Sequence, residues 1–162
     1  MRRVYFAAIA AAVLAADQLT KLAIVRTLEV GESQPLIGEW LRFHHVRNSG
    51  ASFGLLRGAS GLLALVAIAG AAVLAWIIVR DPPWRVGFGA SLVAGGALGN
   101  LADRIFRPWP FRGTVVDFID VSWWPTFNVA DSAITIGAIM LVLTGVFERR
   151  ASDDGPDAGD GG

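Results

Sequence analysis

The stretch VVDFIDVSWWPTFNVAD, from Val115 to Asp131, decides the fold because it joins a predicted strand to a predicted membrane helix. Its first part, within residues 114–121, alternates β-branched residues and predicts a short strand that carries Asp117. Its last part holds Asn128, a good helix N-cap, and Asp131, which can reach back to the amide of that cap. Carboxylates beside a membrane span are energetically expensive and indicate a functional site. The alternative is that Asp131 only caps its helix and Asp117 only ends its strand.

The composition limits the class of protein. Hydrophobic residues make up 54% of the 162 residues, which is typical of a membrane protein. The formal net charge is zero, so the sequence lacks the basic character that nucleic-acid binding requires. The absence of cysteine excludes disulfides, a thiol nucleophile and cysteine-based metal sites. His44 and His45 are neighbours on a predicted strand and face opposite ways, so we expect no metal site and no cofactor.

Four apolar runs predict four transmembrane helices, at about residues 4–25, 61–79, 86–103 and 129–147. The first run follows two arginines and imitates a secretory signal peptide. Its helical pattern continues for about 33 Å at 1.5 Å per residue, so we interpret it as a retained span. The third run contains Gly95-Gly96-Ala97-Leu98-Gly99, small residues that allow close packing of helix backbones.

Four spans place both ends of the chain on one side of the membrane. The loops at residues 27–60 and 105–127 then lie together on the other side. Residues 1–150 are therefore predicted to form a single membrane domain. The tail at residues 151–162 is rich in glycine and aspartate, and we expect it to be disordered.

Two further acids lie within the predicted spans. Asp17 and Lys21 are four residues apart and share a helix face, which favours a structural ion pair. Asp103 lies at the C-terminal end of its helix, where it opposes the helix dipole and needs a cationic partner. We expect that partner to be Arg104 or Arg107. A structural and a functional role are both open for Asp103.

Five stretches together resemble the lipoprotein signal peptidases, also called signal peptidase II. They are ADQLTK (residues 16–21), RNSGASFG (47–54), GGALGNLADR (95–104), VVDFID (115–120) and FNVADSA (127–133). They follow the order and approximate spacing of the family, and five in order are far more specific than any one alone. The chain departs from the family in its acidic tail, where basic residues are common, and in the Trp-Trp-Pro loop, which the family varies.

The resemblance implies an all-α membrane protein with four transmembrane helices and a small extracytoplasmic β-cradle. It implies a bacterial cytoplasmic (inner) membrane location with both termini cytoplasmic. It also implies an intramembrane aspartic endopeptidase that removes the signal peptide from prolipoproteins, cutting before a cysteine that carries diacylglycerol. The implied partners are lipid-modified prolipoproteins and membrane lipid, without metal or other cofactor, and the expected state is a monomer.

Matched to the family pattern, Asp117 and Asp131 are the implied catalytic pair. The implied supporting or substrate-binding residues are Asn48, Gly50, Ala51, Phe53, Asn100, Asp103, Arg104, Asn128 and Asp17. Two nearby carboxylates cannot both ionise easily, so one stays protonated and the pair titrates as a unit. The first turn of a helix favours ionised Asp131, which would make it the base, but the two roles are left open.

Two other classes of protein compete with a protease. In a proton- or ion-conducting protein, Asp17, Asp103 and Asp131 would be relay groups. A relay needs such groups through the whole membrane depth, and the run at residues 61–79 offers none. A purely structural subunit leaves the acids unexplained. Cleavage of a lipid-modified precursor peptide separates the protease from both alternatives.

Overall fold

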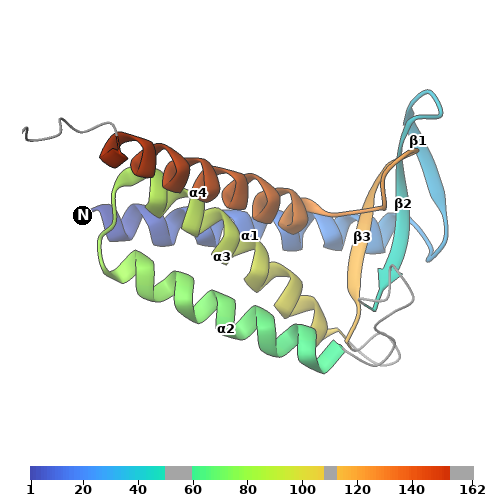
Figure 1. Cartoon of the computed structure of the whole chain (residues 1–162). Coiled ribbons are helices and arrows are strands. Elements are labelled where there is room, and N and C mark those ends of the chain that lie inside the picture. The colour runs from blue at the N-terminus through green and yellow to red at the C-terminus, as the bar shows by residue number, and fades with distance from the viewer. Residues whose placement is uncertain (50–59, 108–112, 154–162) are drawn as a thin grey trace, which may run out of the picture.

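The structure, a computed structural model, describes residues 1–49, 60–107 and 113–153. Within these residues the chain forms four helices and three strands: α1 (Arg2–Thr27), β1 (Ser33–Ile37), β2 (Leu41–Asn48), α2 (Ser60–Val79), α3 (Trp84–Phe106), β3 (Val115–Val121) and α4 (Val129–Asp153). Figure 1 shows the helices running side by side, with the sheet at one end of the bundle. The four predicted helices are thus confirmed as helices. However, α4 continues to Asp153, into the tail that was predicted to be disordered.

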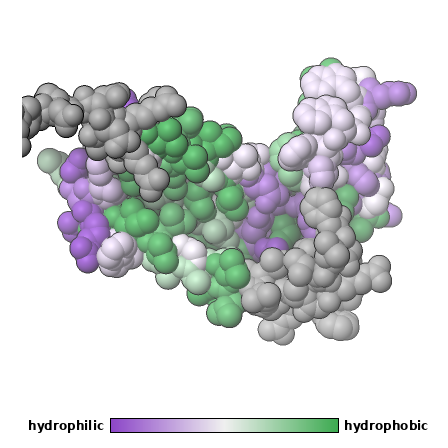
Figure 2. Space-filling view, viewed as in Figure 1, coloured by the Kyte–Doolittle hydropathy of each residue, from purple (hydrophilic) through white to green (hydrophobic). Residues whose placement is uncertain are grey.

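The outer surface of the bundle is apolar. By length and composition, α1 and the Val129–Val146 part of α4 could each cross a membrane, and α2 contains a shorter apolar stretch, Leu65–Val79. Exposed apolar side chains on α2 and α4 include Leu65, Val66, Val73, Ile136, Ile139, Val142 and Leu143. Figure 2 shows this hydrophobic surface along the helices, with polar surface nearer the two ends. Two of the described helices are therefore candidate membrane spans.

Helix α3 packs closely against both α1 and α4 through its glycines. A Cβ atom on Gly96 would lie 2.5 Å from the carbonyl oxygen of Ala130 in α4. A Cβ atom on Gly99 would lie 2.5 Å from Oδ2 of Asp17 in α1. These separations are too short for any side chain, so the glycine run lets α3 approach its neighbours, as predicted.

The sheet is antiparallel, with strand order β1-β2-β3. The two predicted strands are confirmed as β2 and β3, whereas β1 was not predicted. It contains Pro35 and is exposed along its whole length, as befits an edge strand. One core cluster joins the sheet to the end of α1 through Val116, Phe118, Ile24 and Leu28. This packing fixes β3, and with it Asp117, at the end of the helix bundle.

Candidate active site

The N-terminus of α4 is held by side chains from two helices. The Oδ1 atom of Asn128 accepts a hydrogen bond from the N–H of Asp131 at 2.9 Å, and Oδ2 of Asp131 accepts one from the N–H of Asn128 at 3.2 Å. These reciprocal hydrogen bonds confirm the predicted helix capping by Asn128 and Asp131. Asp17 of α1 accepts another bond, from the N–H of Ala130 at 3.0 Å. Asp131 is therefore fixed in the first turn of α4.

Asp117 is almost fully buried, with 2% of its surface exposed. Its Oδ2 accepts a hydrogen bond from Nδ2 of Asn48 at 2.8 Å, and its Oδ1 accepts one from Nδ2 of Asn128 at 2.7 Å. Burial raises the pKa of Asp117 from 3.8 to about 6, and the nearby negative charge of Asp131 adds to this effect. The hydrogen bonds from the two asparagines oppose it. Asp117 can therefore gain or lose a proton close to neutral pH.

A chain of amide hydrogen bonds joins the two carboxyl groups. Asn100 of α3 donates from Nδ2 to Oδ1 of Asp131 at 2.8 Å. Asn128 donates to Oδ1 of Asn100 at 3.2 Å as well as to Asp117. Within the residues that the structure describes, neither Asp117 nor Asp131 forms an ion pair. The two acids are thus held by the neutral amide groups of three asparagines, which come from β2, α3 and the connection between β3 and α4.

Lys21 lies beside this chain and is completely buried. Its Nζ is 2.8 Å from Oδ2 of Asp17 and 3.1 Å from Oδ2 of Asp103, and it donates to Oδ1 of Asn100 at 2.9 Å. The predicted pair of Asp17 with Lys21 is confirmed. Lys21 also orients the Asn100 amide, because an oxygen that accepts from Lys21 leaves the amide nitrogen to bind Asp131.

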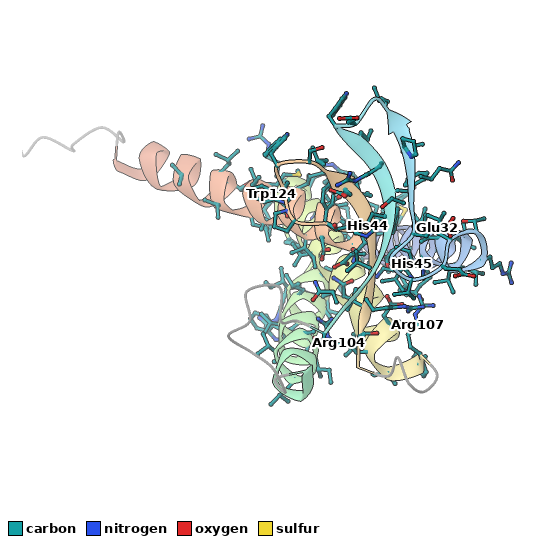
Figure 3. All side chains as sticks on the ribbon, turned by 90° about the vertical axis from the view of Figure 1, so that its right-hand side faces the viewer. Glu32, His44, His45, Arg104, Arg107 and Trp124 are labelled. Carbon is teal, nitrogen blue, oxygen red and sulfur yellow. The ribbon has the colours of Figure 1, made fainter. Side chains whose placement is uncertain are left out.

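The partner of Asp103 on its own helix is Arg107 rather than Arg104. Nη2 of Arg107 lies 2.7 Å from Oδ1 of Asp103, and Oδ2 of Asp103 accepts a bond from the N–H of Val116 at 3.0 Å. Arg104 instead donates to the backbone oxygen of Asn100 at 3.1 Å. Figure 3 shows both arginines at the sheet end of the bundle. Asp103 therefore ties α3 to α1 and to β3.

The two histidines occupy an irregular part of β2, between Phe43 and Val46, where the register with β3 shifts. His45 is buried, and its Nδ1 lies 2.9 Å from the carbonyl oxygen of Leu28. Burial lowers the pKa of His45, so the ring is neutral at physiological pH. His44 lies 3.6 Å from Asp120, and both histidines are labelled in Figure 3. No group of three metal-ligating side chains occurs among the described residues.

Most of the predicted site residues meet at this end of the bundle. The described ones are Asp117, Asp131, Asn48, Asn100, Asn128, Asp17, Asp103 and Arg104. Gly50, Ala51 and Phe53 lie outside the described residues. Sequence reasoning missed the contact of Lys21 with Asn100 and Asp103. A lysine within an apolar span was the available indication, since such residues rarely lack a specific partner.

A cavity of about 330 Å³ opens beside Asp117. It is lined by Val46, Arg47, Asn48, Ser49, Asp117, Pro125 and Thr126. Strands β2 and β3 and the connection to α4 build the wall of this cavity. Asp117 and Asn48 are among its polar residues. The arrangement offers a titrating carboxyl group to a bound peptide.

Comparisons with known proteins agree with this geometry. Residues 9–147 match the family model described as signal peptidase (SPase) II. The chain is 46% identical to a lipoprotein signal peptidase of Mycobacterium avium over 142 residues, covering 86% of this chain and 77% of the relative. It is 48% identical to that of Rhodococcus jostii over 148 residues, covering 88% and 72%.

Two solved structures share the fold. Both are bacterial membrane enzymes determined by the in meso method, at 2.3 Å and 1.9 Å resolution. The first gives a TM-score of 0.81 at 31% identity, covering 94% of this chain and 93% of the other. The second gives 0.77 at 34% identity, covering 86% and 91%.

Proposed function

The chain belongs to the signal peptidase II family of lipoprotein-processing membrane proteases, and from this premise we propose that it is an aspartic endopeptidase. It removes the signal peptide from prolipoproteins by cutting before a cysteine that carries diacylglycerol. Asp117 and Asp131 are the catalytic pair. The observation that carries this proposal is the amide chain that joins the two acids while Asp117 keeps a pKa of about 6.

The two acids divide the work of hydrolysis. Ionised Asp131 takes a proton from a water molecule as the water oxygen bonds to the scissile carbonyl carbon. Protonated Asp117 donates a hydrogen bond to the carbonyl oxygen. The proton that Asp131 took from water then passes to the amine as the carbon–nitrogen bond breaks. The raised pKa of Asp117 supports its role as the acid. The position of Asp131 in the first turn of α4 supports its role as the base.

The surrounding residues position these acids and the substrate. Asn48 and Asn128 hold Asp117, and Asn100 holds Asp131. The charge of Arg104 attracts both carboxylates, and its buried Nε has no hydrogen-bond partner among the described residues. We assign Arg104 to the substrate backbone. Gly50, Ala51 and Phe53 shape the loop over the groove, while Asp17 and Asp103 hold the helices around it.

All four helices cross the bacterial cytoplasmic membrane in this proposal, with both termini inside and the sheet outside. Residues 1–150 act as one domain, the substrate enters laterally between helices, and the monomer is the active unit. Because the chain has no cysteine, single cysteines report topology cleanly. Gln34→Cys should react with an impermeant thiol reagent from outside, and Arg85→Cys should not. The reverse pattern would contradict the placement of the site.

Purified protein should cleave a synthetic precursor peptide that carries a diacylglyceryl cysteine. Mass spectrometry should find a fragment that begins at the modified cysteine. The same peptide without the lipid is the matched control and should be cleaved much more slowly. An intact modified peptide after prolonged incubation with folded protein would contradict the proposed function.

A further inference from the structure

A second, apolar pocket lies near the start of α4. Its volume is about 300 Å³, and its lining consists of Val121, Trp123, Trp124 and Phe127. Trp123 is 78% exposed and Trp124 58% exposed, and their rings pack edge to face with centroids 6.0 Å apart. We call these four residues the tryptophan pocket. Exposed aromatic surface of this kind marks a binding site for an apolar ligand.

The backbone around the pocket is well anchored. The N–H of Trp124 donates to the carbonyl oxygen of Val121 at 2.7 Å, closing a tight turn. Ser122 donates from its N–H to Trp40 and from its hydroxyl to the backbone oxygen of Glu39, so the turn is fastened to the β1–β2 connection. The backbone that carries the pocket is thus fixed before a ligand enters, which lowers the ordering cost of binding.

The pocket continues the surface that carries Asp117. Val121 follows Asp117 by four residues on β3, so both side chains leave the same face of the strand, about 13 Å apart. The next part of the connection, Pro125 and Thr126, lines the cavity beside Asp117. One short segment therefore separates the tryptophan pocket from the proposed reaction centre.

The sheet that carries the pocket stands beside the apolar surface of the bundle. Figure 2 shows the sheet end projecting sideways from the bundle, with a hollow between it and the hydrophobic helix surface. Exposed apolar residues of α4, such as Ile136 and Ile139, extend that lipid-facing surface. Apolar side chains are therefore exposed both on α4 and in the tryptophan pocket.

We propose that the tryptophan pocket binds an acyl chain of the diacylglyceryl group on the substrate cysteine. This inference rests on the proposed function, since the lipid must be attached beside the scissile bond. A thioether-linked glyceryl group bridges a distance of the order that separates Asp117 from Val121. Indole rings suit such a ligand because their faces are apolar and their N–H groups can donate to ester carbonyls at the membrane interface.

Acyl-chain length tests this inference. Two precursor peptides, one with palmitoyl and one with acetyl groups on the glyceryl cysteine, are compared in phospholipid-free detergent. We compare kcat/KM for the long-chain substrate with kcat/KM for the short-chain substrate. Trp124→Ala should lower this ratio about tenfold, which corresponds to the burial of roughly two fewer methylene groups. The change should appear in KM, with kcat nearly unchanged.

Trp40→Ala is the matched control, because Trp40 in the β1–β2 connection is 53% exposed but lines a different cavity. It should leave the ratio unchanged. An equal loss for both substrates with Trp124→Ala would overturn the inference. So would an effect that appears only in phospholipid bilayers, since that result would assign the pocket to bulk lipid.

A binding measurement separates failure of this inference from failure of the proposed function. The Asp117→Asn variant is mixed with a precursor whose acyl chains carry bromine, which quenches tryptophan fluorescence on contact. Quenching should be strong, should fall when Trp124→Ala is added, and should persist when Trp40→Ala is added instead. Equal quenching in both double variants would place the chain elsewhere, whether or not the wild-type protein cleaves.

Discussion

Two pairs of carboxylates lie at the same end of the helix bundle, and their partners differ. Asp17 and Asp103, the ion-paired acids, share Lys21 at 2.8 and 3.1 Å. Asp117 and Asp131, the amide-held acids, are bound by asparagine side chains and form no ion pair within the described part of the chain. The two pairs meet at Asn100, which binds Lys21 through its oxygen and Asp131 through its nitrogen.

The difference shows that the partner, not the residue type, decides what a buried acid can do. A carboxylate paired with a buried cation holds helices together, because separating the pair would strand a buried charge. Burial and the charge of Asp131 raise the pKa of Asp117 to about 6 against the opposing asparagine hydrogen bonds, so Asp117 can exchange a proton. This contrast agrees with the proposal that the ion-paired acids serve the fold and that Asp117 takes part in the chemistry.

The largest effect is expected from removing proton exchange at the amide-held acids. Asp117→Asn or Asp131→Asn should each lower the cleavage rate about 10²–10⁴-fold while the protein stays folded. The double variant should be scarcely slower, because the two residues act as a unit. Cleavage of the lipid-modified peptide and thermal unfolding in detergent provide the two measurements.

Asp120→Asn is the matched control for this prediction. Asp120 lies on β3 like Asp117 and is nearly buried, but it pairs with Arg42. Its substitution should leave the cleavage rate close to that of the wild type. If Asp117→Asn stayed active and Asp103→Asn did not, Asp103 would be the partner of Asp131, and the comparison of the two pairs would fail.

The next largest effect is expected from the cation of the ion-paired acids. Lys21→Met leaves Asp17 and Asp103 without their shared partner, which should lower the free energy of unfolding by about 3–5 kcal/mol. Arg42→Met removes a half-exposed pair and should cost only about 0–1 kcal/mol. Denaturant unfolding in detergent measures both. A Lys21→Met protein as stable as Arg42→Met would show that the buried cluster does not hold the fold.

A smaller effect is expected from the pH dependence of stability. The pKa of Asp117 is raised on folding, so its stabilising contribution is complete below pH 3.8 and is lost as pH rises through about 6. At 1.36 kcal/mol per pH unit, the loss is about 3 kcal/mol. Wild-type protein should therefore lose more stability between pH 4.5 and 7.5 than Asp117→Asn does. Parallel stability profiles for the two proteins would contradict the raised pKa.

The smallest effect is expected from the packing of α3 against α1 beside the ion-paired acids. A methyl group at Gly99 would meet Oδ2 of Asp17, so Gly99→Ala should lower the unfolding free energy by about 1–3 kcal/mol. It should also slow cleavage, because Asp17 caps α4 through Ala130. Gly70→Ala is the control, since no atom lies within 4 Å of its added Cβ. Equal stability of the two variants would show that α3 can move away without cost.

Local pattern was enough to predict the helices, β2, β3 and the cap of α4. These features depend on residues close in sequence, such as Asn128 and Asp131. The sequence alone could also have predicted Arg107, rather than Arg104, as the partner of Asp103. Residues four apart share a helix face, whereas adjacent residues point in different directions.

The remaining contacts are long-range, and no local pattern contains them. Asn48 binds Asp117 across 69 residues, and Lys21 binds Asn100 across 79. Family resemblance named most of these residues but not their partners. Strand β1 was missed because Pro35 and an exposed, irregular edge leave no alternating pattern to detect.

The bond from Asp17 to the N–H of Ala130 links the first helix to the last across 113 residues. Chains emerge from the ribosome N-terminus first, so Asp17 is made long before its partner exists. A chain still in synthesis at residue 120 already carries Asp117, but it has neither Asp131 nor the α4 backbone that Asp17 caps. If the proposed pair carries out cleavage, each new molecule stays inert toward neighbouring membrane proteins until α4 has formed.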